Sequence, residues 1–198
     1  MSISPIIPPR AVPRIVLIRN INDAELERLS TKRKTLTSDE RAFVDAAPSH
    51  VRQALRVLQL DIRRTHARPG DHISVAHTDD TLAVALSAAR VGIDIEPLCE
   101  LPHGTDASDD GSLSLGQLFS VAEQETIRDG DSFTRAWVRK EAYAKWLGTG
   151  LTDELANGVY ETETHVFLHD DLYVSVAGLG STEARIKDSY CRIVPKNE

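Results

Sequence analysis

The sequence predicts an α+β fold, with helices and a small sheet in each half of the chain. Two observations predict it. In each half of the chain, segments with apolar residues at helical spacing are followed by short segments rich in β-branched residues. A Gly-, Ser- and Asp-rich stretch at 100–115, just after Pro97, has no periodic pattern. We therefore expect halves at 1–98 and 99–198.

The first half is expected to open with one strand and three helices. The strand is the apolar, mostly β-branched run at 15–18. Ser38 is a candidate N-cap for the second helix, and Pro69-Gly70 predicts a turn after the third. The expected helices cover 23–29, 38–47 and 50–60.

Three short strands are expected to complete the first half. They are 72–77, 81–87 and 91–96, and Thr78-Asp79-Asp80 supplies the turn between the first two.

The second half is expected to contain two helices and four strands. Ser120 and Glu123 form a capping-box pattern that opens a helix over 120–129. A longer helix over 132–147 should stop at Gly148. The expected strands are 159–162, 165–169, 172–177 and 184–194.

Composition excludes several classes of protein. The net charge of −7, from 30 acidic and 23 basic residues, argues against general nucleic-acid binding. No apolar run approaches the roughly 20 residues that span a bilayer, and the N-terminus lacks the pattern of a signal peptide. We expect a cytoplasmic protein that does not bind membranes, with Cys99 and Cys191 as free thiols.

The charge is nevertheless uneven along the chain. Basic residues are common between Arg28 and Arg68, whereas the stretch from Asp94 to Asp131 is strongly acidic. This distribution favours a ligand with negative groups, held in part through a metal ion.

Two carboxylates lie on one face of the strand at 91–96. Residues i and i+2 of a strand share a face, so Asp94 and Glu96 lie side by side while Ile93 and Ile95 enter the core. Hard oxygen ligands of this kind suit Mg²⁺, which takes one or two carboxylates and completes its shell with water and phosphates. The alternative is an acidic, solvent-facing strand.

A stripe on the 132–147 helix adds a third carboxylate and an ammonium. Trp137, Glu141 and Lys145 recur every four residues, so they share one side of the helix. Taken alone, Glu141 and Lys145 are better explained as a common solvated pair. His77, at the end of its strand, is either structural or a donor to a nearby phosphate.

The ordered motifs resemble the 4′-phosphopantetheinyl transferases, in particular the larger surfactin-synthetase type. The family's Gly-Asp-Glu strand matches Val91-Gly-Ile-Asp-Ile-Glu96, and its helical signature matches Trp137-Val-Arg-Lys-Glu-Ala-Tyr-Ala-Lys145, followed by Gly148-Thr-Gly-Leu151. Its Phe-Ser-x-x-Glu segment resembles Leu118-Phe-Ser-Val-Ala-Glu123, and its Ser-His strand resembles Ile73-Ser-Val-Ala-His77. The resemblance covers roughly residues 38 to 151.

The resemblance implies transfer of the 4′-phosphopantetheine arm of coenzyme A to a serine of an apo acyl, peptidyl or aryl carrier protein, with release of 3′,5′-ADP. It implies that Asp94, Glu96 and Glu141 hold Mg²⁺ at the pyrophosphate. Glu141, or Glu96 through water, would take the proton of the carrier serine. Lys145 would bond the attacked phosphate or the departing oxygen.

The resemblance also assigns the 3′-phosphate of coenzyme A to His77 and Arg41. Arg68 stands where the family has the lysine of Gly-Lys-Pro, and Ala76 stands where it has a serine. The roles of Arg52 and Arg56, on the third expected helix, stay open.

The fold that the resemblance implies is two similar halves, each a small antiparallel sheet with packed helices. The halves form a monomeric pseudo-dimer, with coenzyme A in the cleft between them. Two other functions stay open. The same carboxylates would serve a Mg²⁺-dependent nucleotide phosphoesterase, and a degenerate module would bind coenzyme A or a carrier without catalysis.

Overall fold

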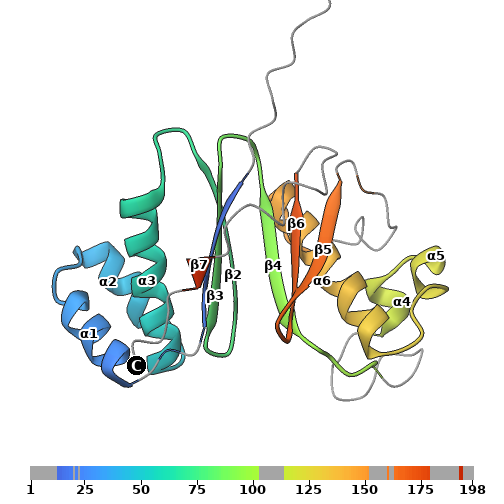
Figure 1. Ribbon diagram of the computed structural model, residues 1–198, viewed down its shortest axis with the longest axis horizontal. Coiled ribbons are helices and arrows are strands. Elements are labelled where there is room, and N and C mark those ends of the chain that lie inside the picture. Colours follow the sequence, from blue (N-terminus) through green and yellow to red (C-terminus); the bar gives the residue numbers. More distant parts are fainter. Residues whose placement is uncertain are drawn as a thin grey trace, which may run out of the picture.

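The fold consists of two sheets at the centre of the molecule, with helices on their outer sides (Figure 1). The computed structural model describes residues 13–19, 21, 23–102, 114–151, 160, 163–178 and 192–193. The predicted α+β class is confirmed for these residues.

The first sheet has the strand order β2-β3-β1-β7. Strands β1, β2 and β3 pair antiparallel, and β7 adds to β1 in parallel. The strands are β1 Arg14–Ile18, β2 His72–Thr78, β3 Thr81–Ser87 and β7 Arg192–Ile193. The helices beside this sheet are α1 Asp23–Arg33, α2 Ser38–Asp45 and α3 His50–His66.

Strand β3 is buried on both faces, which explains its nearly continuous apolar sequence. Leu82, Val84 and Leu86 pack with helical residues such as Leu29 and Leu55 in one core. The intervening side chains are small, and they join a second core between the sheets.

The second sheet has the strand order β4-β6-β5, with all pairs antiparallel. Its strands are β4 Gly92–Pro97, β5 Thr164–His169 and β6 Leu172–Ala177. The helices on its side of the molecule are α4 Leu115–Leu118, α5 Val121–Gln124 and α6 Gly130–Leu147. Helix α6 packs against β4, β5 and β6.

The two sheets face each other across a shared apolar core. Ala83 and Ala85 of β3 pack in the same cluster as Ile93 and Ile95 of β4, all at most 1% exposed. The backbone N–H of Ile93 also donates a 3.0 Å hydrogen bond to the hydroxyl of Ser74 in β2. This contact fixes β4, the strand with the paired carboxylates, against the first sheet.

Strand β4 comes before the expected boundary at residue 98, yet its hydrogen-bonded partner is β6. The boundary itself stays a prediction. The expected strands at 159–162 and 184–194 lie almost wholly outside the described residues. Only Tyr160 of the first range and the two residues of β7 in the second range are described.

Two local predictions were wrong. The N-cap of α2 is Thr37, not Ser38, because Thr37 forms a reciprocal capping box with Glu40. The helix opened by Ser120 ends at Gln124, and Asp129 caps α6 instead, so the expected single helix over 120–129 is divided.

Helix α6 is the longest helix on this side, and no helix in the described ranges is long and apolar enough to cross a membrane. Cys99 is a free thiol, as expected, and Cys191 lies outside the described residues.

Candidate active site

Helix α6 approaches the backbone of β4 at Gly92. A Cβ atom on Gly92 would lie 2.0 Å from the Ala142 carbonyl oxygen and 2.6 Å from the Trp146 backbone nitrogen. Only glycine permits this contact. The helix is held at both ends, by the Asp129 capping box and by Gly148 in the left-handed conformation with a φ of 77°.

The alternation of β4 turns two carboxylates toward α6. Ile93 and Ile95 lie in the core between the sheets, so Asp94 and Glu96 share the opposite face with Gly92. Asp94 is 3% exposed, whereas Glu96 is half-buried.

Lys145 of α6 joins these carboxylates. Its Nζ donates a 2.6 Å hydrogen bond to Asp94 Oδ1 and lies 3.9 Å from Glu141 Oε2. The Trp137 side chain acts on Glu96 from the same helix and partly offsets the rise in the pKa of this carboxyl. The stripe expected on this helix therefore faces the strand expected to carry the carboxylates.

The cluster carries more negative charge than its one lysine balances. Burial raises the pKa of Asp94 to about 7, and repulsion from Glu141 and Glu96 adds to it against the attraction of Lys145. Burial, followed by repulsion from Glu141, also raises the pKa of Glu96. A further cation would stabilise both carboxylates.

One oxygen of the cluster has no hydrogen-bond partner among the described residues. Asp94 Oδ2 is buried and accepts no hydrogen bond from the described part of the chain. Within that part, no three His, Cys, Asp or Glu side chains converge closely enough to enclose a metal ion. The arrangement is thus two strand carboxylates with Glu141 nearby, and not a closed cage.

His77 lies at the end of β2, exposed, within electrostatic reach of this cluster. Partial desolvation lowers the pKa of its imidazole, and three cations lower it further: Arg52, Lys145 and Arg56. Contributions from α3 and from α6 show that both sides of the molecule bring positive charge to His77.

Arg52 is the residue that sequence reasoning left without a role. Its Nη1 atom is buried and has no hydrogen-bond partner in the described ranges. Arg56, one turn along α3, donates to the Phe43 carbonyl and stacks over the Phe43 ring at 4.7 Å. The i, i+4 spacing of the two arginines was the available signal, but only the fold places them near His77.

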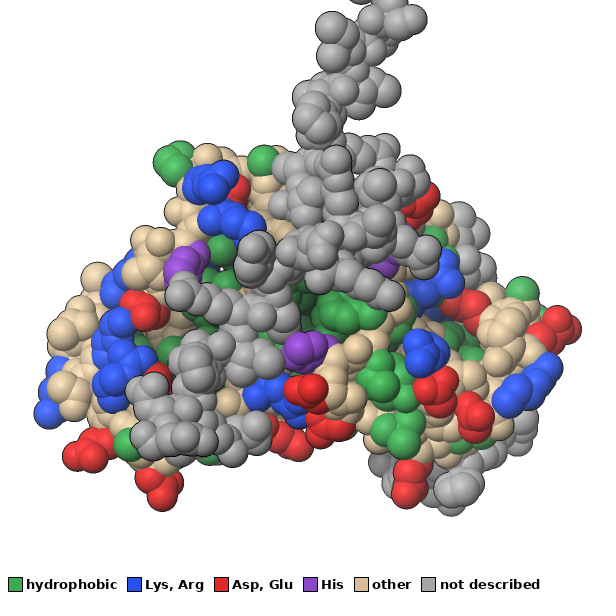
Figure 2. Space-filling view, viewed as in Figure 1, with side chains coloured by type: hydrophobic (Ala, Val, Ile, Leu, Met, Phe, Trp, Pro, Cys, Tyr) green, Lys and Arg blue, Asp and Glu red, His purple; other side chains and the backbone are tan. Residues whose placement is uncertain are grey.

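Arg41 and Arg68 occupy other positions. The guanidinium of Arg41 donates a 3.3 Å hydrogen bond to the Leu36 carbonyl. Arg68 is exposed beside the Pro69-Gly70 turn, and its backbone N–H donates to Asp71. Figure 2 shows Lys and Arg side chains distributed over the α1–α3 side of the molecule, in agreement with the basic stretch between Arg28 and Arg68.

A second ion pair, between Lys140 of α6 and Glu123 of α5, lies next to the cluster in the sequence. Lys140 is 1% exposed, and its Nζ lies 2.6 Å from the Leu118 carbonyl and 2.9 Å from Glu123 Oε2. Glu123 also accepts a 2.6 Å hydrogen bond from the Tyr160 hydroxyl. This network ties α5 to α6 next to Glu141. Tyr143, at 2% exposure, belongs to the core here.

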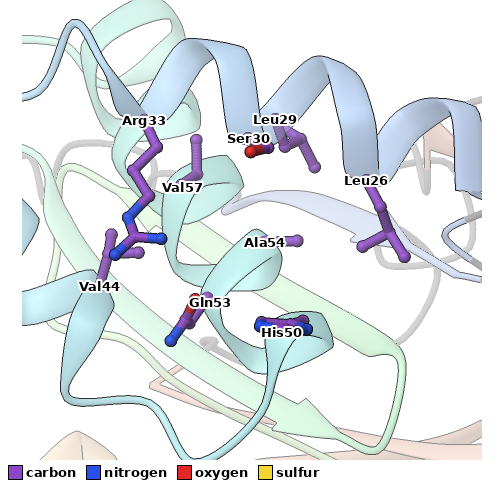
Figure 3. Close-up of a pocket in the computed structure, with 9 residues that line it drawn as sticks. All are labelled: Leu26, Leu29, Ser30, Arg33, Val44, His50, Gln53, Ala54 and Val57. Carbon is purple, nitrogen blue, oxygen red and sulfur yellow. The ribbon is translucent and has the colours of Figure 1, made fainter.

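A separate cavity of about 320 Å³ lies between α1, α2 and α3 (Figure 3). It shares no residue with the carboxylate cluster, and its Arg33 is paired with Asp45. The cavity is lined by Leu26, Leu29, Ser30, Arg33, Val44, His50, Gln53, Ala54 and Val57.

Residues 90–185 match the family model of the 4′-phosphopantetheinyl transferase superfamily. The match includes β4, α4 to α6, β5 and β6, and with them Asp94, Glu96, Glu141 and Lys145. This part of the chain is therefore similar to that superfamily, and the similarity supports a transferase acting on carrier proteins. No curated protein matches the chain.

Proposed function

We propose that this protein transfers the 4′-phosphopantetheine group of coenzyme A to a serine of an apo acyl, peptidyl or aryl carrier protein. In this reaction the serine oxygen bonds to the phosphorus on the pantetheine side of the pyrophosphate. The bond from that phosphorus to the bridging oxygen breaks, and 3′,5′-ADP leaves with the electron pair.

The observation that carries the proposal is the position of Lys145 between Asp94 and Glu141, within the range that matches the superfamily. One ammonium has three donors, so Lys145 is suited to exchange a carboxylate for a phosphate oxygen. There it would stabilise the charge that develops on the attacked phosphate or on the departing oxygen.

The residues present fit a magnesium ion. Asp94 Oδ2 is buried and unpaired among the described residues. Burial, with repulsion from Glu141, raises the pKa values of Asp94 and Glu96, so that a bound cation would stabilise both carboxylates. Asp94 and Glu96 would hold the ion, and Glu141 would have to move closer to them to become a further ligand. When bound, Mg²⁺ neutralises the pyrophosphate.

We assign the general base to Glu141. Its side chain is 24% exposed, against 4% for Asp94, so it can approach the hydroxyl of a docked serine and accept its proton. Glu96 is the alternative base, acting through water.

We propose that His77 and Arg52 bind the 3′-phosphate of coenzyme A. Arg52 Nη1 is buried without a hydrogen-bond partner in the described ranges, and the charge of Arg52 acts on His77; both observations support this assignment. Arg41 would contribute only by leaving the Leu36 carbonyl, and Arg68 would have to turn from solvent toward the phosphate.

Further details of the proposal come from the resemblance to the surfactin-synthetase type. The halves would form a pseudo-dimer in a monomeric, cytoplasmic enzyme, with coenzyme A in the cleft between them. The two-sheet arrangement, with His77 on one side and Asp94 on the other, supports this placement.

The test is incubation of the full chain with coenzyme A, Mg²⁺ and a panel of apo carrier proteins. Intact mass spectrometry should show carriers heavier by one phosphopantetheine, with 3′,5′-ADP as the second product. Glu141→Gln and omission of Mg²⁺ should each abolish the shift.

Two results would contradict the proposal. Hydrolysis of coenzyme A without any carrier would favour the nucleotide phosphoesterase. An absent mass shift across the panel, together with tight coenzyme A binding, would favour the degenerate binding module.

A further inference from the structure

Ser175 of β6 lies directly opposite Asp94 of β4 in the second sheet. Directly opposed residues of an antiparallel pair share a face, so Ser175 points toward α6 as Asp94 does. Ser175 is 0% exposed. A fully buried hydroxyl therefore stands beside the most buried carboxylate of the cluster.

Both side chains leave one atom unpaired. In the described part of the chain, Ser175 Oγ and Asp94 Oδ2 are buried atoms without a hydrogen-bond partner. A buried polar atom without a partner costs about 1–3 kcal/mol. The Cβ atoms of opposed residues lie about 4.5–5.5 Å apart, a separation that a serine hydroxyl and a carboxylate bridge with one hydrogen bond.

The neighbouring positions of β6 cannot supply this hydrogen bond. Val174 and Val176 face the core between the sheets. Tyr173 is opposite Glu96 on the α6 face, but its hydroxyl donates a 2.5 Å hydrogen bond to Asp131. Ala177, opposite Gly92, has no polar side-chain atom.

We propose that Ser175 is a positioning residue. Its hydroxyl is not bonded to Asp94 in this structure, but it turns to donate to Asp94 Oδ2 when the site binds its ligands, and so orients that carboxylate for a divalent cation. Lys145 holds the other oxygen, Oδ1, at 2.6 Å. When Lys145 turns to a substrate phosphate, the Ser175 hydroxyl keeps Asp94 in place. The inference rests on the proposed function.

A carboxylate that binds a metal depends on the groups that hydrogen-bond to it, and the loss of such a group typically costs 10- to 100-fold in metal affinity or activity. Ser175→Ala removes the hydroxyl without adding volume. The matched control is Ser87→Ala, since Ser87 is also a buried strand serine, but its hydroxyl accepts from the Ala89 N–H in the first sheet.

The experiment measures Mn²⁺ binding to the full chain with coenzyme A present, by electron paramagnetic resonance of the free ion. Ser175→Ala should weaken Mn²⁺ binding about tenfold. Ser87→Ala should match the parent protein. Ser175→Cys, which has a weaker donor, should lie between the parent and Ser175→Ala. Coenzyme A binding without metal should be equal in all four proteins.

Equal Mn²⁺ affinity of the parent and Ser175→Ala would overturn the inference and leave the proposed function intact. If Ser175→Ala does not fold, parental affinity in Ser175→Cys decides the question in the same way. A parent protein that binds no Mn²⁺ in the presence of coenzyme A would contradict the proposed function, and this inference with it.

Discussion

Lys145 and Asp94 are 51 residues apart in the sequence, and their side chains meet at 2.6 Å between α6 and β4. The two partners differ in exposure, since the side chain of Lys145 is 32% exposed and that of Asp94 is 4% exposed. The carboxylate is fixed in the protein, whereas the ammonium can reach solvent. Lys145 is therefore the partner that can move to a bound substrate.

Replacing Lys145 by alanine should lower kcat about 10²-fold or more, because one charge-stabilising donor at the transition state is lost. Steady-state rates of carrier modification measure the effect. Lys32→Ala is a matched control, since Lys32 is also 32% exposed and paired with an aspartate, Asp61, away from the site. An unchanged kcat in Lys145→Ala would mean that this lysine has no role in the chemical step.

Arg52→Ala should raise the KM for coenzyme A about tenfold, the loss expected for one hydrogen bond to a charged group. With dephospho-coenzyme A, which lacks the 3′-phosphate, parent and variant should show the same KM. Arg63→Ala, at the exposed end of α3, is the control and should leave both values unchanged. Equal penalties on both substrates would place Arg52 away from the 3′-phosphate.

Gly92→Ala should destabilise the protein by about 1–3 kcal/mol or more, because the new Cβ would lie 2.0 Å from the Ala142 carbonyl oxygen. Urea denaturation measures the free energy of unfolding. Gly116→Ala is the control, since its Cβ would lie no closer than 3.8 Å to any neighbour, and it should be neutral or slightly stabilising. Equal stabilities of the two variants would contradict the close approach of α6 to β4.

Glu123→Gln should destabilise the protein by about 3–5 kcal/mol at pH 7, because it leaves Lys140 buried without its carboxylate. Burial opposes ionisation of Glu123, but hydrogen bonds from Tyr160, Lys140 and Ser120 outweigh it and lower the pKa below the ordinary 4.5.

This lowered pKa fixes the sign of the pH dependence. The stability that ionised Glu123 contributes is complete above about pH 4.5 and is lost as the pH falls through the folded-state pKa. The difference in unfolding free energy between parent and Glu123→Gln should therefore shrink below pH 4.5. Glu25→Gln, in a surface pair with Arg28, should cost at most about 1 kcal/mol. If the difference in unfolding free energy between parent and Glu123→Gln does not change with pH, Glu123 is not ionised in the folded protein.

The sequence alone predicted the elements that local chemistry determines. The capping box of Ser120 and Glu123, the helix end at Gly148 and the shared face of Asp94 and Glu96 follow from residues within one turn or one strand. The same local motifs carried the resemblance to the phosphopantetheinyl transferases, which the match over 90–185 supports at the level of the superfamily.

Tertiary structure decided what depends on distant residues. The pairing of β4 with β6 places Ser175 beside Asp94, and the burial of Lys140 against Glu123 depends on the packing of α5 on α6. Local spacing indicated only an amphipathic helix for Trp137, Glu141 and Lys145. This helix contacts β4 only in the folded chain. There, burial raises the pKa of Asp94 to about 7, together with the charges that folding brings around it.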